Sequence, residues 1–376
     1  MTGAPLWNRS ASLAPLLGLL LASSVSAEYR NGIRFDPGRE MTTRAEGAPA
    51  ELDRVTGFVG QWDVEIVQPQ PEGDAIQATG LAEITFMNRG HALMENLYSE
   101  SFDGHEFAAL QFLGFNPASQ RWFLAGADSW DQHAWVADGD FKGDALVLSD
   151  ISRPGGGITL TETRYSLEQP DKDTLQLKIE SSTDRGAAFS TVEERTYSRR
   201  EASPDFMKSS STHGSPAPDR FPEATAFDFL VGEWTASHDM TFPNGQSAQW
   251  VANATAVYAL NGSAVMEFNW FDVDPNLPDA ATTILRIYNR GMRRWENLYM
   301  TNRGSSVLYF GGVQEGDAIV LHSFDSGASG TISRWVFYDI EKDSYRWYGE
   351  SSTDRGKTWN KTWKIDFERK PPKTEK

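Results

Sequence analysis

Short runs rich in apolar residues recur along the chain, for example at residues 81–87, 107–115 and 174–180, and in the last of these apolar and polar residues alternate strictly. Alternation with a period of two is typical of a β-strand that buries one face. The runs are rich in aromatic and β-branched residues, and clusters of Gly, Pro, Asn and Asp separate them. Residues 53–58 and 226–230 are expected to form short helical turns, and nothing resembles a long amphipathic helix. The pattern therefore predicts an all-β protein.

The chain contains the same blocks twice, in the same order. Residues 58–62 (Phe-Val-Gly-Gln-Trp) reappear at 230–234 as Leu-Val-Gly-Glu-Trp, and residues 180–186 are identical to residues 350–356. Five such blocks keep an offset of 170 to 173 residues. So long a period with a constant order indicates two copies of a complete folding unit, not a solenoid of short repeats.

The repeat predicts two tandem domains, at residues 53–200 and 225–370. Each unit is long enough to bury a core of its own. Residues 201–224 are rich in Ser and Pro and are expected to form a linker. Residues 28–52 and 371–376 are expected to be an N-terminal extension and a tail.

The N-terminus has the parts of a secretory signal peptide. Arg9 supplies a positive charge, residues 13–21 form a short apolar core, and Val25 and Ala27 are small residues placed as at a cleavage site. We therefore expect residues 1–27 to be removed on export to the periplasm or the extracellular space. The apolar core is too short to span a bilayer comfortably, so no membrane span is predicted in the mature chain. An uncleaved N-terminal anchor is the alternative.

The composition narrows the classes of function. The net charge of −17 repels polyanions, so nucleic acid is not an expected partner. Because the chain has no cysteine, disulfides, thiolate nucleophiles and Cys-ligated metals are excluded. The six histidines do not occupy matching places in the two copies, and no nucleotide-binding or hydrolase motif is present. No cofactor and no metal site are predicted, and the oligomeric state stays open.

A Gly-x-Trp motif opens each copy, with Gly60 and Trp62 in the first and Gly232 and Trp234 in the second. The motif resembles the first strand of the lipocalins and their wider calycin superfamily, where it closes the base of an antiparallel barrel. The resemblance assigns these four residues to the structural closure of two barrels.

The same resemblance implies an arginine late in each copy that stacks on this tryptophan. Arg199 or Arg200 in the first copy, and Arg369 in the second, lie where such a partner would be found. A guanidinium group over an indole ring is a favourable cation–π contact.

The order of the following strands extends the resemblance. The Gly-x-Trp strand leads to a strand ending in Leu-Met-Glu in the first copy, then to a strand with an aromatic-Asn turn, and then to an Arg-Trp strand. This order is similar to the bacterial domain-of-unknown-function 1579 family, which is placed among calycin-like barrels. The resemblance covers most of both copies and implies two tandem antiparallel β-barrels of roughly eight to ten strands, whose interiors side chains nearly fill or which hold one small ligand. It implies no activity.

One strand face in each copy is a candidate cavity lining. In the second copy this face carries Met266, Phe268 and Trp270, and because it is the more apolar face we place it inside the barrel. The ligand-binding residues predicted in this way are Met94, Asn96, Tyr98, Met266, Phe268 and Trp270. A pocket lined by Met and aromatic residues suits a small apolar molecule, and a packed core without a cavity is the alternative.

Glu95 and Glu267 are acidic residues at matching strand positions in the two copies. If buried, either could act as a general acid or base, because burial raises the pKa of a carboxyl group. The alternation that places Met94 and Met266 inside places both glutamates on the outer face, as solvated charges.

The Ser-x-Asp-x-Gly segments at residues 182–186 and 352–356 look like the Asp-box hairpin of sialidases. In a tight hairpin the Asp accepts backbone N–H bonds and the Gly supplies a positive φ, so we interpret both segments as structural. No glycosidase is inferred, because that chemistry needs a pair of carboxylates at matching depth.

Three functions remain open. The first is an exported binding protein for a small apolar molecule, held in a barrel cavity. The second is an enzyme that uses such a cavity, of isomerase or hydratase type, on a lipid-like or polyketide-like substrate. The third is a structural or interaction protein whose barrels are filled. The copies diverge at Asn96 and Tyr98 against Phe268 and Trp270, so their cavities are expected to differ.

Overall fold

A computed structural model describes residues 29–30, 33–34, 43–152, 160–203, 215–242, 244–270, 280–302, 304–324 and 331–371. The predicted signal peptide at residues 1–27 lies outside the described residues. Apart from the short pair β1 (Tyr29–Arg30) and β2 (Ile33–Arg34), the strands form two closed antiparallel barrels of ten strands each. The predicted all-β class and the two tandem barrels are thereby confirmed.

Barrel 1 consists of β3 to β12, and each strand pairs with the next along the chain until β12 returns to β3. Its strands are β3 (Gly60–Gln68), β4 (Ile76–Met87), β5 (Ala92–Phe102), β6 (His105–Asn116), β7 (Arg121–Asp128), β8 (Ala134–Lys142), β9 (Ala145–Ser152), β10 (Thr161–Asp171), β11 (Thr174–Ser182) and β12 (Ser190–Arg199).

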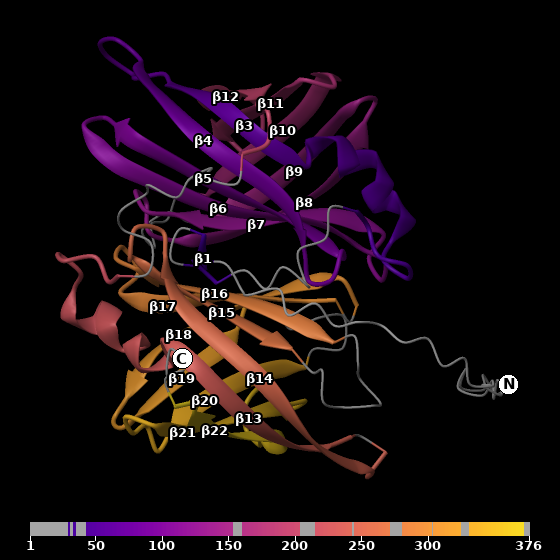
Figure 1. Cartoon of the computed structure of the whole chain (residues 1–376), viewed down its shortest axis with the longest axis vertical. Coiled ribbons are helices and arrows are strands. Elements are labelled where there is room, and N and C mark those ends of the chain that lie inside the picture. Colours follow the sequence, from indigo (N-terminus) through magenta and orange to yellow (C-terminus); the bar gives the residue numbers. More distant parts are fainter. Residues whose placement is uncertain are drawn as a thin grey trace, which may run out of the picture.

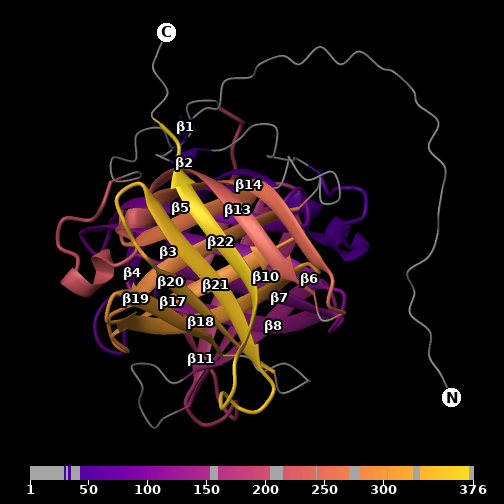
Figure 2. The same cartoon turned by 90° about the horizontal axis from the view of Figure 1, so that it is seen from below.

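Barrel 2 repeats this order with β13 to β22, and β22 closes on β13. Its strands are β13 (Gly232–Thr241), β14 (Ser247–Ala259), β15 (Ala264–Trp270), β16 (Ala281–Asn289), β17 (Arg294–Thr301), β18 (Ser306–Glu315), β19 (Ala318–Ser323), β20 (Ile332–Tyr338), β21 (Ser344–Ser352) and β22 (Asn360–Arg369). In Figure 1 barrel 1 lies above barrel 2, and Figure 2 looks at barrel 2 from below, with β13, β21 and β22 in front.

Short 3₁₀ helices close one end of each barrel, near the helical turns that the sequence predicts. They are η1 (Ala50–Phe58) in barrel 1, and η3 (Pro222–Thr225) and η4 (Asp228–Leu230) in barrel 2. Leu52, Val55 and Phe58 of η1 are buried against the strands. We call this end of each barrel its closed end. Within the described part of the chain, no helix has the length and apolar character needed to cross a membrane.

The Gly-x-Trp motif and a late arginine hold each closed end. In barrel 1 the guanidinium carbon of Arg199 lies 4.1 Å from the centre of the Trp62 ring, and Arg199 donates a 2.9 Å hydrogen bond to the carbonyl of Val59. A Cβ atom on Gly60, whose φ is +149°, would lie 2.5 Å from the Arg199 Nη1, so only glycine fits there. Arg200 instead pairs with Asp63 at 3.2 Å.

Barrel 2 repeats this closure. Arg369 lies 4.1 Å over the Trp234 ring and donates to the carbonyl of Val231 at 2.8 Å. A Cβ atom on Gly232 would also collide with the guanidinium group of its arginine. The predicted stacking of a late arginine on each tryptophan is confirmed, with Arg199 as the partner in barrel 1.

A buried apolar interface joins the two barrels. It combines outward-facing residues of β4 to β8 with those of β14 to β18, and these strands lie against each other in Figure 1. Met94 and Met266 are buried in it, at 3% and 0% exposure. Hydrogen bonds cross it as well, such as the one that Thr283 donates to Asn88 at 2.8 Å.

The predicted placement of the Met-bearing face inside the barrels is therefore wrong. The strand alternation holds, but the more apolar face of β5 and β15 packs between the barrels. The residues on this outer face are Met94, Asn96, Tyr98, Met266, Phe268 and Trp270. A strand that packs against a second barrel is buried on both faces, so the greater apolarity of one face does not identify the lumen.

Glu95 and Glu267 correspondingly point into the barrels and not to solvent. Glu95 is 9% exposed and Glu267 is 4% exposed. Glu95 accepts a 2.8 Å hydrogen bond from the Tyr197 hydroxyl, which crosses the interior of barrel 1. The expectation that both are solvated charges on the outer face is also wrong, for the same reason.

Candidate ligand-binding site

The end of barrel 1 opposite η1 is open and holds a pocket of about 680 Å³. Ligand pockets typically have volumes of a few hundred to about 1,000 Å³, so this one can hold a small organic molecule. Deeper in barrel 1 only about 20 Å³ remains free, between residues such as Glu95 and Leu177. Barrel 1 is thus packed at its closed end and hollow at its open end.

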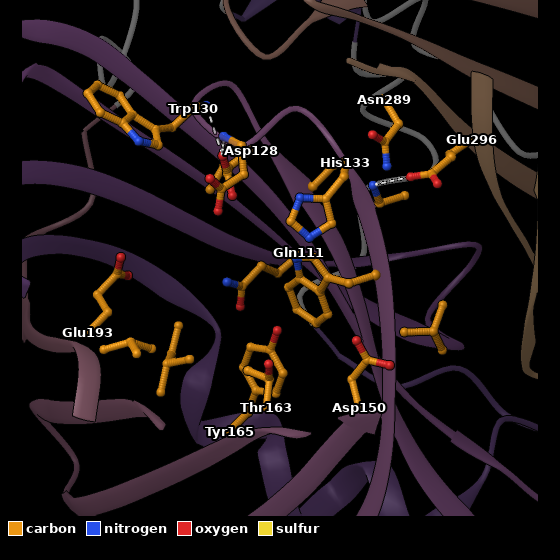
Figure 3. A pocket seen from close by; sticks show the side chains of 18 of the residues that line it. Gln111, Asp128, Trp130, His133, Asp150, Thr163, Tyr165, Glu193, Asn289 and Glu296 are labelled. Atoms are coloured by element: carbon orange, nitrogen blue, oxygen red, sulfur yellow. Dashed lines mark hydrogen bonds between the residues drawn. The ribbon is translucent and has the colours of Figure 1, made fainter. Parts of the chain in front are cut away.

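The pocket wall comes mainly from the inner faces of β6 to β12. Figure 3 shows polar and aromatic side chains converging on a common space. The inner side chains include Phe107, Gln111, Asp128, Trp135, Asp150, Thr163, Tyr165, Glu193 and Arg195. The lining is therefore mixed and not the purely apolar surface that the sequence led us to expect.

A stacked aromatic pair forms one side of the pocket. The rings of Trp135 and Tyr165 lie 4.6 Å apart at an angle of 14°. Gly126, on the neighbouring strand β7, makes room for this pair. A Cβ atom there would lie 2.8 Å from the Trp135 ring and 2.6 Å from the carbonyl oxygen of Leu110. The absence of a side chain at Gly126 thus lets Trp135 lie flat across the strand.

Carboxyl groups are concentrated around the pocket. The lining contains the carboxylates of Asp128, Asp131, Asp150, Glu193 and Glu296. Against these five the described lining contains two guanidinium groups, and both are ion-paired within it: Arg195 with Glu193, and Arg294 with Glu296 at 2.7 Å. The pocket therefore carries an excess of negative charge.

Asp128 is a buried carboxyl group of the pocket with a shifted pKa. It accepts hydrogen bonds from the backbone N–H groups of Trp130 and Asp131, at 2.8 and 2.7 Å. Burial, reinforced by the negative charge of Asp131, raises the pKa of Asp128 to about 6. Asp128 can therefore exchange a proton close to neutral pH. In the part of the chain that the structure describes, no group of three or more His, Asp or Glu residues is arranged to hold a metal ion.

A polar network lies beneath the pocket floor. Gln111 bridges Glu95 and Arg195: its amide nitrogen donates to Glu95 at 3.3 Å, and its oxygen accepts from Arg195 at 3.2 Å. Arg195 in turn pairs with Glu193. Burial raises the pKa of Glu95, although the charge of Arg195 and the hydrogen bond from Tyr197 oppose this. The network links the buried glutamate to the pocket through side chains with defined positions.

The lumen of barrel 2 is filled at the corresponding depth. Trp335, Trp347 and Trp363 pack against one another there, with ring centres 5.6 and 5.2 Å apart. The free volume between them and their described neighbours is about 50 Å³. Glu267 lies in this lumen and pairs with Arg286 at 2.6 Å, with both side chains almost fully buried. The two cavities differ as expected, but not at Asn96, Tyr98, Phe268 and Trp270, from which the difference was predicted, because these residues lie outside the lumens.

His238 also belongs to the filled lumen. Its ring stacks on Trp250 with centres 4.7 Å apart, and its Nδ1 accepts a 3.0 Å hydrogen bond from Trp363. Burial lowers the pKa of His238 to about 3. The histidine is therefore neutral and part of the aromatic packing.

The two Asp-box segments form hairpins at the open ends. In barrel 1 Ser182 donates to Asp184 at 2.6 Å and accepts from the N–H of Gly186 at 2.9 Å. In barrel 2 Ser352 and Asp354 repeat the bond at 2.7 Å. These bonds join atoms of the same turn, as expected for a structural hairpin.

Sequence reasoning missed most of the pocket residues. Trp135, Asp128 and Asp150 do not belong to a motif and do not match a like residue in the second copy, and Tyr165 aligns with Trp335, which belongs to the filled lumen. A signal was nevertheless present in the differences between the copies. Aligning the strand registers places Gly126 opposite Tyr299, so that one copy lacks a side chain where the other has a large one.

A comparison with known protein families finds a match in barrel 1. Residues 50–199 match the family model described as "Protein of unknown function (DUF1579)". The match spans barrel 1 from η1 to β12. Barrel 2 has the same strand order and the same closure, although the match covers only the first barrel. The comparison with curated proteins finds no match.

Two solved structures are similar over most of the chain. One is a protein with unknown function from the DUF3598 family of Nostoc punctiforme, with 11% identity, a TM-score of 0.28, and coverage of 85% of this chain and 99% of that one. The other is a mutant of the vaccine antigen transferrin binding protein B from Haemophilus parasuis, with 9% identity, a TM-score of 0.17, and coverage of 83% and 76%. At these scores neither similarity bears on the function of barrel 1.

Proposed function

We propose that barrel 1 binds a small organic molecule in the pocket at its open end. The observation that carries this proposal is the contrast between the 680 Å³ pocket at the open end of barrel 1 and about 50 Å³ between the described residues of the barrel 2 lumen. Protein interiors are normally close-packed, and a void of this size forfeits many dispersion contacts. A binding function explains why one copy keeps the space that the other fills.

The lining supports a ligand with a flat apolar part and a positive charge. The stacked rings of Trp135 and Tyr165 offer an aromatic surface, which favours planar groups and cations. The carboxylates outnumber the guanidinium groups, so an anion would meet repulsion while a cation would relieve the repulsion among Asp128, Asp131 and Asp150. An amphipathic organic cation therefore fits the pocket better than the purely apolar molecule expected from sequence.

Binding of two planar dyes of opposite charge tests this proposal. We expect the cation thioflavin T to bind the full-length protein and the anion anilinonaphthalene sulfonate to bind at least tenfold more weakly, since several kT of local potential separate the two charges. Removing two pocket charges with Asp131→Asn and Asp150→Asn should weaken thioflavin T about tenfold, consistent with partly screened charges at short range.

A matched control removes two charges from the opposite end of the barrel. Asp144 and Glu168 are exposed at the closed end, so Asp144→Asn with Glu168→Gln changes the net charge equally but leaves the pocket intact. Dye affinity should then stay within twofold of the parent protein. Equal binding of both dyes would contradict the charge preference, and the absence of any binding would contradict the proposed function.

A further inference from the structure

Barrel 2 contributes directly to the pocket of barrel 1. Asn289, Gly291, Met292, Arg294, Glu296 and Tyr309 of barrel 2 lie along the pocket rim. Figure 3 shows Glu296 reaching from barrel 2 to the backbone of barrel 1 beside the pocket. The site is therefore built from two barrels, although its hollow belongs to one.

The contact is centred on Ala134, the first residue of β8. Its backbone N–H donates to the Oε2 atom of Glu296 at 2.9 Å, and its carbonyl accepts from the Tyr309 hydroxyl at 3.0 Å. Ala134 is 4% exposed and Glu296 is 1% exposed, so the bond between them is shielded from water, and the Tyr309 bond is partly buried. Shielded hydrogen bonds are costly to lose, because the groups left behind have no solvent to bind.

Near the open end β9 no longer pairs with β8 within the described residues, so the start of β8 is held by other groups. Along the described part of β9, the ladder between β8 and β9 runs from Lys142 and Ala145 to Asp138 and Ser149. Ala134 lies beyond that ladder, although β7 still pairs with it through Ala127. Side chains of barrel 2 thus bind the N–H and C=O groups of Ala134 at the point where β9 does not.

Trp135 follows Ala134 in the chain, and the position of its ring depends on the backbone at this point. We infer that barrel 2 acts as a positioning element for the ligand site, with Glu296 and Tyr309 holding the start of β8 so that Trp135 stacks on Tyr165. The inference rests on the proposed binding function for its ligand measurement, but not for the backbone geometry. It assigns a role to the filled second barrel.

Glu296 is itself held in place for this role. Arg294 donates to its Oε1 atom at 2.7 Å, and the other oxygen remains for Ala134. A buried carboxylate needs such a partner, since an unpaired charge is strongly disfavoured away from water. The pair thus orients one carboxylate oxygen toward barrel 1.

Tyr309→Phe is the sharpest variant, because it removes one hydroxyl and keeps the ring. We expect thioflavin T to bind about fivefold more weakly, and amide hydrogen exchange in the segment 130–138 to become about fivefold faster, as expected for one lost hydrogen bond. The matched control is Thr283→Val, which removes another hydrogen bond between the barrels, to Asn88, away from the pocket. That control should change neither quantity by more than twofold.

The two measurements separate this inference from the proposed function. If the parent protein does not bind the dye, the proposed function fails, and the exchange rates alone decide the inference. Unchanged exchange in Tyr309→Phe would overturn the positioning role in either case. If exchange rises while dye affinity stays within twofold of the parent value, barrel 2 anchors β8 without shaping the site, and the inference is overturned as well.

Discussion

Barrel 1 and barrel 2 have the same strand order and the same closure, yet their lumens are opposite in character. Aligned registers place Gly126 opposite Tyr299, Ala137 opposite Phe310, and Glu193 opposite Trp363. At each pair the second barrel has an aromatic ring where the first has none, and those rings occupy the space that is open in the first. The comparison shows that one topology accommodates either an open or a filled lumen, depending on the side chains at inward positions.

The two lumens also differ in their charged residues. In barrel 1 Glu193 and Arg195 lie at the pocket, whereas Trp363 and Ile365 replace them in barrel 2. The buried pair of Glu267 and Arg286 in barrel 2 has no such opening beside it, and only about 50 Å³ is free there. The polar groups of barrel 1 can therefore meet a ligand, while Glu267 and Arg286 pair with each other in the closed lumen of barrel 2.

Removing a large side chain from the filled lumen of barrel 2 tests how tightly that lumen is packed. Trp347→Ala should lower the free energy of unfolding by about 3–5 kcal/mol, because a large buried ring leaves a cavity that neighbours only partly refill. Urea unfolding followed by circular dichroism measures the loss. Thioflavin T affinity should not change while the protein stays folded, since Trp347 lies in the other barrel from the pocket.

The outcome of this variant would be decisive for the support role. A loss below about 1 kcal/mol would mean that the lumen of barrel 2 is loosely packed, because even modest core truncations usually cost that much. A weaker dye affinity in the folded variant would show that the packing of the barrel 2 lumen affects the ligand site.

The reciprocal variant is Trp135→Ala in barrel 1. Trp135 offers its ring to the pocket and stacks on Tyr165. Removing a central aromatic contact typically costs about 2 kcal/mol of binding energy, so thioflavin T should bind about thirtyfold more weakly. The loss of stability should be smaller than in Trp347→Ala, since part of the Trp135 ring borders open space and not packed neighbours.

This pair of variants compares binding with packing directly. Trp347→Ala should reduce stability and spare binding, whereas Trp135→Ala should reduce binding more than stability. If Trp135→Ala binds the dye as tightly as the parent protein, the stacked pair is not the binding surface, and the proposed site would have to be rejected.

The sequence was sufficient for the fold because the fold depends on features that both copies retain. The alternation, the turn clusters, the Gly-x-Trp motif and a late arginine recur at constant offsets, and each has a local physical role. The number of strands and the choice of Arg199 over Arg200 needed the three-dimensional register. Repetition thus identified the residues that build the barrel.

The same reasoning misplaced the candidate site because it assumed one buried face per strand. Met94 and Met266 are apolar because they lie between the barrels, while Glu95 and Glu267 face lumens that hold charge partners such as Arg286. A strand face is buried both when it packs against a second domain and when it lines a lumen. One sequence therefore does not distinguish the two environments. The pocket itself depends on positions where the copies differ, which repetition cannot reveal.

A last prediction concerns pH. The two barrels differ at one titrating group, which is present only in barrel 1. Asp128 has a pKa raised to about 6, whereas the aligned position in barrel 2 is Thr301, which does not titrate. As pH falls from 7.5 to 5, Asp128 gains a proton and its attraction for a cation disappears. Thioflavin T should therefore bind about three- to fivefold more weakly at the lower pH, as expected for roughly 1 kcal/mol from one partly screened charge.

Asp128→Asn removes this titration and keeps an oxygen that can accept the N–H groups of Trp130 and Asp131. The variant should bind the dye with one affinity across this pH range, close to that of the parent protein at low pH. Because a bound cation favours the ionised carboxylate, ligand should also lower the pKa of Asp128, and proton release on binding should be greatest near pH 6, the pKa of the free group. A pH dependence that persists in Asp128→Asn would assign the titration to another group, and the excess negative charge would then have to act through Asp131 or Asp150.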